Sequence, residues 1–252
     1  MELTDEGRLL LEIVQPHVSS LDSLARLFEA RRADLPQELV VASGTYLLAH
    51  HLPGPVRQFR AEWPAVQLNL RVAAWSALHR LTDRGEADVA VLACDPDVPR
   101  SPFLQYEHLF DEPLSLIAPD NHPLVRLKRI TPHDLVKHPL ILPPKGGADR
   151  KALDRFFRKH DISDRLDTAV VCGLVDVTKN YVARGLGVAL MYVTEEVLRG
   201  TPGLRLRPLD PEIERLPIEM AVRKGAHLPE YAHAFCRLVR QFLAQTISPP
   251  KS

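Results

Sequence analysis

The chain has 252 residues, of which 45% are hydrophobic and 25% are charged. At roughly 150 residues per domain, this length fits one large domain or two small ones, and the composition excludes a disordered chain. Lysine plus arginine number 32 and aspartate plus glutamate number 32, so a net charge of zero gives this chain no electrostatic footprint for nucleic acid.

The sequence shows no sign of a membrane or of export. No run approaches the roughly 20 apolar residues that span a bilayer, and residues 1–7 lack the basic and apolar regions of a signal peptide. We therefore expect a cytoplasmic protein with no membrane partner. Cys94, Cys172 and Cys236 are far apart and form no CxxC pair, which predicts free thiols and no zinc site.

Residues 5–32 predict one long helix, because their apolar residues recur at helical spacing. Steps of four and three residues form the narrow seam of a coiled coil. The seam consists of Leu10, Val14, His17, Leu21, Leu24 and Phe28. Such a stripe could cover the protein's own core, but we favour a partner helix from a second subunit. Pro16 predicts a kink near Gln15.

Residues 36–93 alternate between strand and helix patterns. We expect strands at 38–42, 66–72 and 87–93, a helix from 46 to 63 that bends at Leu52, and a second helix at 76–84. Strands that alternate with helices of about ten residues imply a parallel sheet with helices on both faces.

The second half of the chain repeats this alternation after a strand at 114–118, where we place a boundary between two lobes. Further strands are expected at 140–142, 168–171 and 188–192, and helices at 149–160 and 175–183. Gly185 and Gly187 are interpreted as structural turn residues. A strand at 218–222 and a final helix at 230–245 are too few to form a lobe, so we expect them to return to the first one.

Three strand-to-helix turns form the candidate ligand site. Free backbone N–H groups and the helix dipole attract anions at such turns. The turns consist of Ser43, Gly44, Thr45 and Tyr46; of Pro144, Lys145, Gly146 and Gly147; and of Cys172, Gly173, Leu174 and Val175. Serine and threonine could merely cap a helix, but three turns at corresponding places indicate a ligand held between two lobes, beyond the strand ends. Lys145 could add a positive charge.

Catalysis and metal binding find little support in the sequence. Cys172 is the only candidate nucleophile, but a lone cysteine between a strand and a helix is more often a packing residue. His50 and His51 are adjacent and point to different faces, while His133 and His138 lack ligand spacing, so we interpret these histidines as solvated or capping. The basic run 126–129 is interpreted as a solvated face. We expect no enzyme, no metal and no cofactor.

Several short motifs, in their order and spacing, resemble those of the LysR-type transcriptional regulators. Residues 3–8 are similar to the sequence motif that joins the winged helix-turn-helix of that family to its linker helix. The further matches are residues 38–42, Leu52, Pro53, Phe59, Pro64, residues 85–90 and residues 185–190. These motifs cover essentially the whole chain. Residues 176–187 are similar to the corresponding stretch in the branch of the family that controls sulfur assimilation.

The resemblance implies an α/β fold with two Rossmann-like lobes of periplasmic-binding-protein type, joined by two crossovers and preceded by the linker helix. The expected parts are residues 1–35 for the end of the wing and the dimerising helix, 36–118 plus 218–252 for lobe I, and 119–217 for lobe II. It also implies a homodimer or homotetramer that senses a small co-inducer. DNA would be read by an N-terminal helix-turn-helix that is missing here, so the chain resembles a truncated member.

The resemblance places effector binding on residues 43–46, with second-lobe contacts near 144–147 and 172–175. The sulfur branch surrounds its anion with threonines, whereas Gly44, Tyr46 and Cys172 in this chain favour a larger organic acid over an inorganic anion. An effector that prefers the closed lobes would shift the population and reposition the DNA-binding heads. Two alternatives stay open, namely a stand-alone two-lobed solute-binding protein and a cleft enzyme that uses Cys172.

Overall fold

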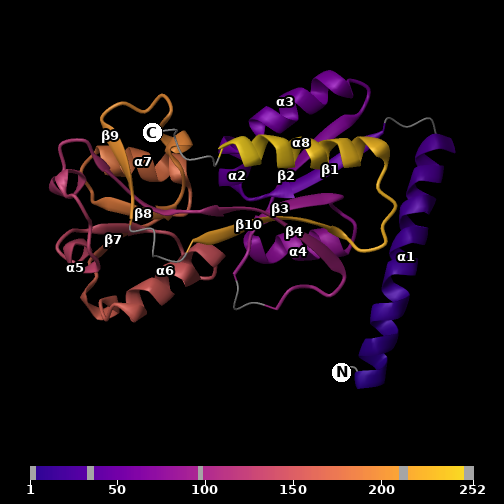
Figure 1. Cartoon of the computed structure of the whole chain (residues 1–252), viewed down its shortest axis with the longest axis horizontal. Helices are drawn as coiled ribbons and strands as arrows, with labels where there is room; N and C mark the ends of the chain where they lie inside the picture. The colour runs from indigo at the N-terminus through magenta and orange to yellow at the C-terminus, as the bar shows by residue number, and fades with distance from the viewer. Residues whose placement is uncertain (1–3, 33–36, 96–98, 210–214, 247–252) are drawn as a thin grey trace. The chain divides into compact units, whose positions relative to one another are not determined.

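The chain forms two compact units, each built on a five-stranded sheet (Figure 1). The structure is a computed structural model that describes residues 4–32, 37–95, 99–209 and 215–246. Unit 1 comprises the described residues within 1–92, 98–110 and 219–252, and unit 2 comprises those within 93–97 and 111–218. The expected two-lobed α/β architecture is confirmed.

The sheet of unit 1 has the order β2-β1-β3-β10-β4. Its strands are β1 (Glu38–Ser43), β2 (Gln67–Val72), β3 (Val89–Ala93), β4 (Leu104–Glu112) and β10 (Leu216–Arg223). β1 runs parallel to β2 and β3, as expected for strands joined by helical crossovers. Apolar side chains of the sheet form the core of unit 1, and Leu39 and Val41 of β1 are fully buried there.

Four helices accompany this sheet: α2 (Thr45–His50), α3 (Pro53–Glu62), α4 (Trp75–Asp83) and α8 (Glu230–Thr246). α3 and α8 lie together on one face, where the rings of Phe59 and Phe235 meet edge to face with centroids 5.5 Å apart, and α4 lies on the other face (Figure 1). The bend expected at Leu52 is a complete break, because Pro53 has no N–H to continue α2 and instead begins α3.

The sheet of unit 2 has the order β7-β6-β8-β5-β9. Its strands are β5 (Leu114–Pro119), β6 (Leu140–Leu142), β7 (Thr168–Val171), β8 (Val188–Tyr192) and β9 (Leu204–Pro208). The helices are α5 (Pro132–Leu135), α6 (Ala148–Lys159) and α7 (Val175–Ala183), with short 3-10 turns at Pro123–Arg126, Ser163–Arg165 and Glu195–Leu198.

The all-parallel arrangement expected for the sheets is wrong for β5. This strand runs antiparallel to both β8 and β9, and its pairing places it in the second sheet. The boundary between the units therefore falls between 110 and 111, earlier than the expected 118. Strands β4 and β9 were not predicted, because exposed and half-buried residues interrupt their apolar pattern.

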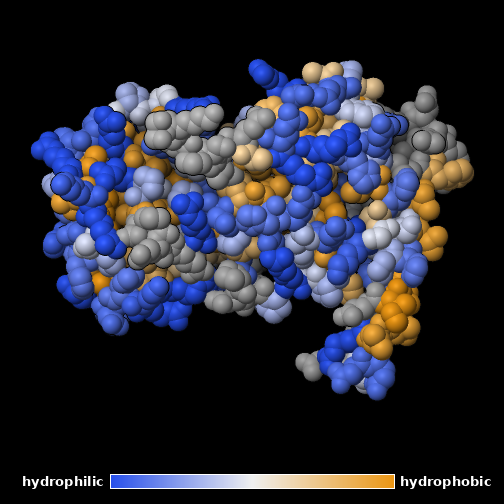
Figure 2. Space-filling model, viewed as in Figure 1, coloured by the Kyte–Doolittle hydropathy of each residue, from blue (hydrophilic) through white to orange (hydrophobic). Residues whose placement is uncertain are grey.

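Helix α1 (Asp5–Arg32) has two different faces. Ser19 and Ser23 are buried, and Ser23 accepts a hydrogen bond from Arg223 at 3.2 Å. On the opposite side, the predicted seam leaves Leu10, Leu21 and Phe28 more than 60% exposed, and Figure 2 shows apolar side chains along this helix. Pro16 lies inside one continuous helix. Within the described ranges, no helix has the length and apolar character needed to cross a bilayer.

Candidate functional site

The turn at residues 43–46 joins β1 to α2 in unit 1. Gly44 is the N-cap residue of α2, at φ −71° and ψ 154°, and no side chain caps this helix. The first N–H groups of a helix have no partner within it, so the start of α2 offers backbone donors. A Cβ built on Gly44 would meet nothing within 4 Å, and Thr45 is exposed. The Cβ side of Gly44 is therefore open.

Ser43 supports this turn from within the sheet. Its side chain is fully buried, and its Oγ donates to the carbonyl oxygen of Val91 at 2.5 Å. The hydroxyl proton is therefore used to join β1 to β3. Of Ser43 and Thr45, only Thr45 presents its side chain to solvent.

Tyr46 is held by two histidines. Its hydroxyl lies 2.9 Å from Nε2 of His51, and its ring is 5.5 Å from that of His50 and 5.1 Å from that of His51. His51 is buried and also contacts Phe110, with ring centroids 5.1 Å apart. Of the two interpretations of His51, as a solvated or as a capping residue, the first is wrong because the ring is buried, whereas His51 does occupy the C-cap position of α2.

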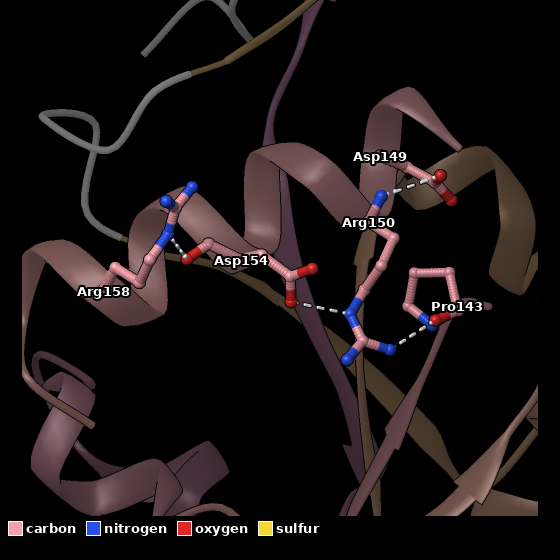
Figure 3. Close-up of polar contacts among 5 residues, drawn as sticks. All are labelled: Pro143, Asp149, Arg150, Asp154 and Arg158. Atoms are coloured by element: carbon pink, nitrogen blue, oxygen red, sulfur yellow. Dashed lines mark hydrogen bonds and ion pairs between the residues drawn. The ribbon is translucent and has the colours of Figure 1, made fainter. Parts of the chain in front are cut away.

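The turn at residues 144–147 leads from β6 into α6 in unit 2. Gly147 is the N-cap residue of α6, and Gly146 has a φ of +101°, a conformation that favours glycine. Lys145 is exposed. Arg150 fixes this turn, because its NH1 donates to the carbonyl oxygen of Pro143 at 2.8 Å and its Nε to Asp154 at 2.8 Å (Figure 3).

Asp149 stands in the first turn of α6 and was not among the predicted site residues. Its Oδ1 accepts a hydrogen bond from the backbone N–H of Arg150 at 2.8 Å (Figure 3). Burial raises the pKa of this carboxyl above its ordinary value, against the lowering effect of the backbone hydrogen bonds and of Arg150. An acid just inside a helix start was the signal in the sequence that could have drawn attention to it.

The turn at residues 172–175 leads from β7 into α7 and lies beside the previous one. A Cβ on Gly173 would come 2.9 Å from Cδ of Pro144, so the structure brings the two unit 2 turns together. Leu174 is the N-cap residue of α7. The half-buried thiol of Cys172 donates to the carbonyl oxygen of Leu174 at 3.7 Å, a weak contact that offers no general base.

Charge distinguishes the starts of those helices that directly follow a parallel strand, namely α2 and α4 in unit 1 and α6 and α7 in unit 2. Neither α2 nor α4 in unit 1 has an acidic residue in its first turn. In unit 2, α6 carries Asp149 and α7 carries Asp176, which pairs with Lys179 at 2.7 Å. In the part of the chain that the structure describes, no group of three or more His, Cys, Asp or Glu residues could hold a metal ion.

Two α/β units, each with strand-to-helix turns at the ends of parallel strands, define a two-lobed class of α/β binding domains. The chain belongs to the LysR substrate binding domain family, whose model matches residues 32–244.

Its similar proteins are transcriptional regulators. The chain is 26% identical over 241 residues to the HTH-type transcriptional regulator CysB of Burkholderia cenocepacia, covering 94% of this chain and 74% of that protein. It is 29% identical over 194 residues to the HTH-type regulator Cbl of Escherichia coli, covering 75% of this chain and 58% of that protein.

Solved structures share the fold. The cofactor-binding domain of Cbl has a TM-score of 0.70 at 24% identity and covers 85% of this chain and 94% of that domain. The effector-binding domain of BenM with its effector benzoate has a TM-score of 0.68 at 22% identity, covering 85% and 96%. That of QuiR in complex with shikimate has a TM-score of 0.69 at 15% identity, covering 82% and 97%.

Proposed function

We propose that this chain is the effector-sensing part of a LysR-type transcriptional regulator and that the anionic group of a small metabolite binds at residues 43–46. The observation that carries the proposal is the start of α2, which has no side-chain cap, no acid in its first turn and open space in front of Gly44. Backbone donors in such a place bind carboxylates without a cationic side chain.

The class of ligand is an organic acid. Benzoate and shikimate, which BenM and QuiR bind, each combine one carboxylate with a ring. In this chain the ring of Tyr46 and the half-buried Cys172 would contact the less polar part of the ligand. Residues 144–147 and 172–175 of unit 2 would complete the site, and Lys145 would add a positive charge.

The response to the effector is a shift of population between arrangements of the chain. An effector that binds one arrangement better favours it by its difference in affinity, and equal affinity would change nothing. Through self-association by the α1 seam, this shift would reposition the helix-turn-helix domains that bind DNA. This role places the protein in the cytoplasm.

The alternative roles have less support. The similar proteins are regulators and not enzymes, and the thiol of Cys172 points to a backbone carbonyl. We therefore propose a binding domain without catalysis and without a cofactor. A stand-alone solute-binding protein would share the two units, but it would have no use for the exposed apolar seam of α1.

Calorimetry with carboxylate ligands tests the site. A thermal-shift screen first selects the acids that stabilise the chain, since a ligand that binds only the folded state raises its stability. Thr45→Val, which replaces the exposed hydroxyl with a methyl group, should weaken the selected acid about tenfold, the value of one hydrogen bond to a charged group. Thr168→Val in β7, also exposed, is the matched control. Equal affinity of both variants would show that the Thr45 hydroxyl does not contact the ligand.

A further inference from the structure

The two faces of α1 are reversed relative to those of an ordinary surface helix. The face toward the rest of unit 1 carries the small polar residues Ser19 and Ser23, which are 3% and 4% exposed. The outward face carries the apolar seam, in which Leu10 and Leu21 are more than 60% exposed. Burial of an apolar stripe usually attaches a surface helix to its protein. At these positions of α1, polar contacts take that role instead.

Arg223, the last residue of β10, makes the polar contact that holds this helix. Its NH2 donates to Oγ of Ser23 at 3.2 Å, and Oγ of Ser23 in turn donates to the carbonyl oxygen of Ser19 at 2.6 Å. The serine hydroxyl is therefore used both as a donor and as an acceptor. All three residues are buried, and a hydrogen bond to a charged group is stronger in such a place than in water.

Two glycines allow close approach around this contact. A Cβ on Gly85 would lie 2.7 Å from Cζ of Arg223, so the guanidinium packs directly on the backbone that follows α4. A Cβ on Gly225 would lie 2.6 Å from the carbonyl oxygen of Pro16, so the turn after β10 meets the backbone of α1. Pro16 precedes Ser23 by about two helical turns, or about 10 Å along the axis. Unit 1 therefore holds α1 at two separate points.

A helix that is held at two points is ordered before it meets a partner. Most of the stability of a helix in a protein comes from packing against the rest of the chain. Two unattached helices that pair must lose their conformational freedom during pairing, and this loss weakens the association. The contacts of Arg223 and Gly225 order α1 in the single chain and leave its seam exposed.

We propose that Arg223 is a positioning residue for self-association: it holds α1 against unit 1, so that the helix is already folded and oriented when its seam meets the α1 of a second copy. The inference rests on the proposed function, which includes pairing through this seam. It goes beyond that function by assigning the contact that prepares the helix for pairing.

Ser23→Lys tests the contact with Arg223, because it places a second cation against the buried guanidinium. The repulsion between two like charges should release this part of α1 from unit 1. Asp22→Lys introduces the same residue at the adjacent, exposed position and is the matched control. Both positions lie outside the seam, so neither variant alters the residues that would contact a partner helix.

Hydrogen exchange of the backbone amides of residues 16–24, followed by mass spectrometry, measures the attachment. Leu10→Glu and Leu21→Glu are present in every protein of this comparison, so that pairing through the seam cannot protect the helix. We expect exchange at least about tenfold faster with Ser23→Lys than with Asp22→Lys, the fold-change for one lost hydrogen bond to a charged group. Exchange in β1 and β3 should be the same in both, which shows that the sheet stays folded.

Gly225→Ala is an independent variant that leaves Arg223 and Ser23 in place. Its methyl group would press on the carbonyl oxygen of Pro16, so exchange in α1 should again become faster. Gly200→Ala is the matched control, because Gly200 has nearly the same φ, +73° against +70°, and nothing within 4 Å of its Cβ position. This pair separates the contact with α1 from the strain of a left-handed alanine.

Sedimentation equilibrium with the seam intact measures the consequence for self-association. Ser23→Lys should raise the dissociation constant about tenfold or more relative to Asp22→Lys, because its α1 must become ordered during pairing. Equal exchange of α1 in the two lysine variants, and in the two alanine variants, would overturn the attachment. Faster exchange with an equal dissociation constant would show that α1 pairs without being held, so the seam would stand and the positioning role would be wrong.

The same measurements separate this inference from the proposed self-association. If the unchanged chain stays single, or if Leu10→Glu with Leu21→Glu leaves its mass unchanged, pairing through the seam fails and the positioning role fails with it. If the seam variant dissociates and Ser23→Lys weakens association while Asp22→Lys does not, both stand.

Discussion

Arg155 of α6 donates to Asp95 at 2.9 Å and joins this helix to the segment that follows β3. The side chain of Asp95 is fully buried, whereas that of Arg155 is 21% exposed. Because α6 begins at the turn 144–147, one helix connects a predicted effector contact to Asp95 of the same unit. This ion pair fixes α6 to Asp95.

Removal of the arginine should therefore destabilise the protein. Arg155→Met keeps the packing of the side-chain stem but leaves a buried carboxylate with one cation fewer, which costs about 3 kcal/mol in comparable buried pairs. Lys151→Met, whose side chain is 42% exposed at 3.6 Å from Asp95, should cost less than about 1 kcal/mol. Urea denaturation measures both. A loss below 1 kcal/mol for Arg155→Met would show that the pair does not stabilise the unit.

Low pH should lower the free energy of unfolding of unit 2, because His122 becomes protonated. Burial lowers the pKa of this histidine below its ordinary value of 6.5, and the charge of His138, whose ring lies 4.7 Å away, lowers it further. Between the lowered pKa and 6.5 the unfolded chain binds more protons than the folded one, so the contribution of His122 to stability is complete above pH 6.5 and is lost as the pH falls from 6.5 through the lowered pKa.

His122→Asn tests this dependence, because Nδ1 of His122 caps the turn at Pro123–Arg126 by accepting from the N–H of Leu124 at 3.3 Å. Asparagine is a good capping residue and does not titrate. The variant should lose less stability between pH 7.5 and about 5.5 than the unchanged protein, as followed by chemical denaturation. His133→Asn, at an exposed position, should keep the original slope; equal slopes for all three proteins would contradict the assignment.

Substitution of Gly187 should lower the free energy of unfolding for a steric reason. At its φ of +152° a Cβ would lie 2.5 Å from the carbonyl oxygen of Pro139, which accepts the hydrogen bond of Val188 that starts β8. Gly187→Ala should cost about 3 kcal/mol, since both the backbone and this contact must shift. Gly185→Ala, at φ +75° with open space around it, should cost about 1 kcal/mol. Similar melting temperatures for the two variants would refute the steric argument.

The fold could be predicted where burial alone decides the pattern. Residues 140–142 and 188–192 form continuous apolar runs and are buried strands, whereas β4 mixes exposed and buried positions and was missed. The turns were found because glycine and proline mark them. The pairing of Asp95 with Arg155 could not be found, because the two residues lie 60 positions apart and only the tertiary fold brings them together.

The seam of α1 gives the last prediction. Leu10 and Leu21 are 63% and 67% exposed, while the opposite face is attached to unit 1 through Ser23 and Arg223. Burial of a leucine side chain in a helix pair contributes about 1.5 kcal/mol or more, so four such residues in a dimer would contribute about 6 kcal/mol. Leu10→Glu with Leu21→Glu should remove this contribution and add like charges across the seam.

Sedimentation equilibrium measures the result as a mass. The double variant should sediment as a single chain of 28.3 kDa at concentrations where the unchanged protein associates. Asp22→Lys, which alters charge at an exposed position of α1 outside the seam, should leave association intact. Because the substituted leucines are exposed in the single chain, the urea midpoint of the rest of the protein should not change. An unchanged mass for the double variant would mean that surfaces other than α1 hold the oligomer together.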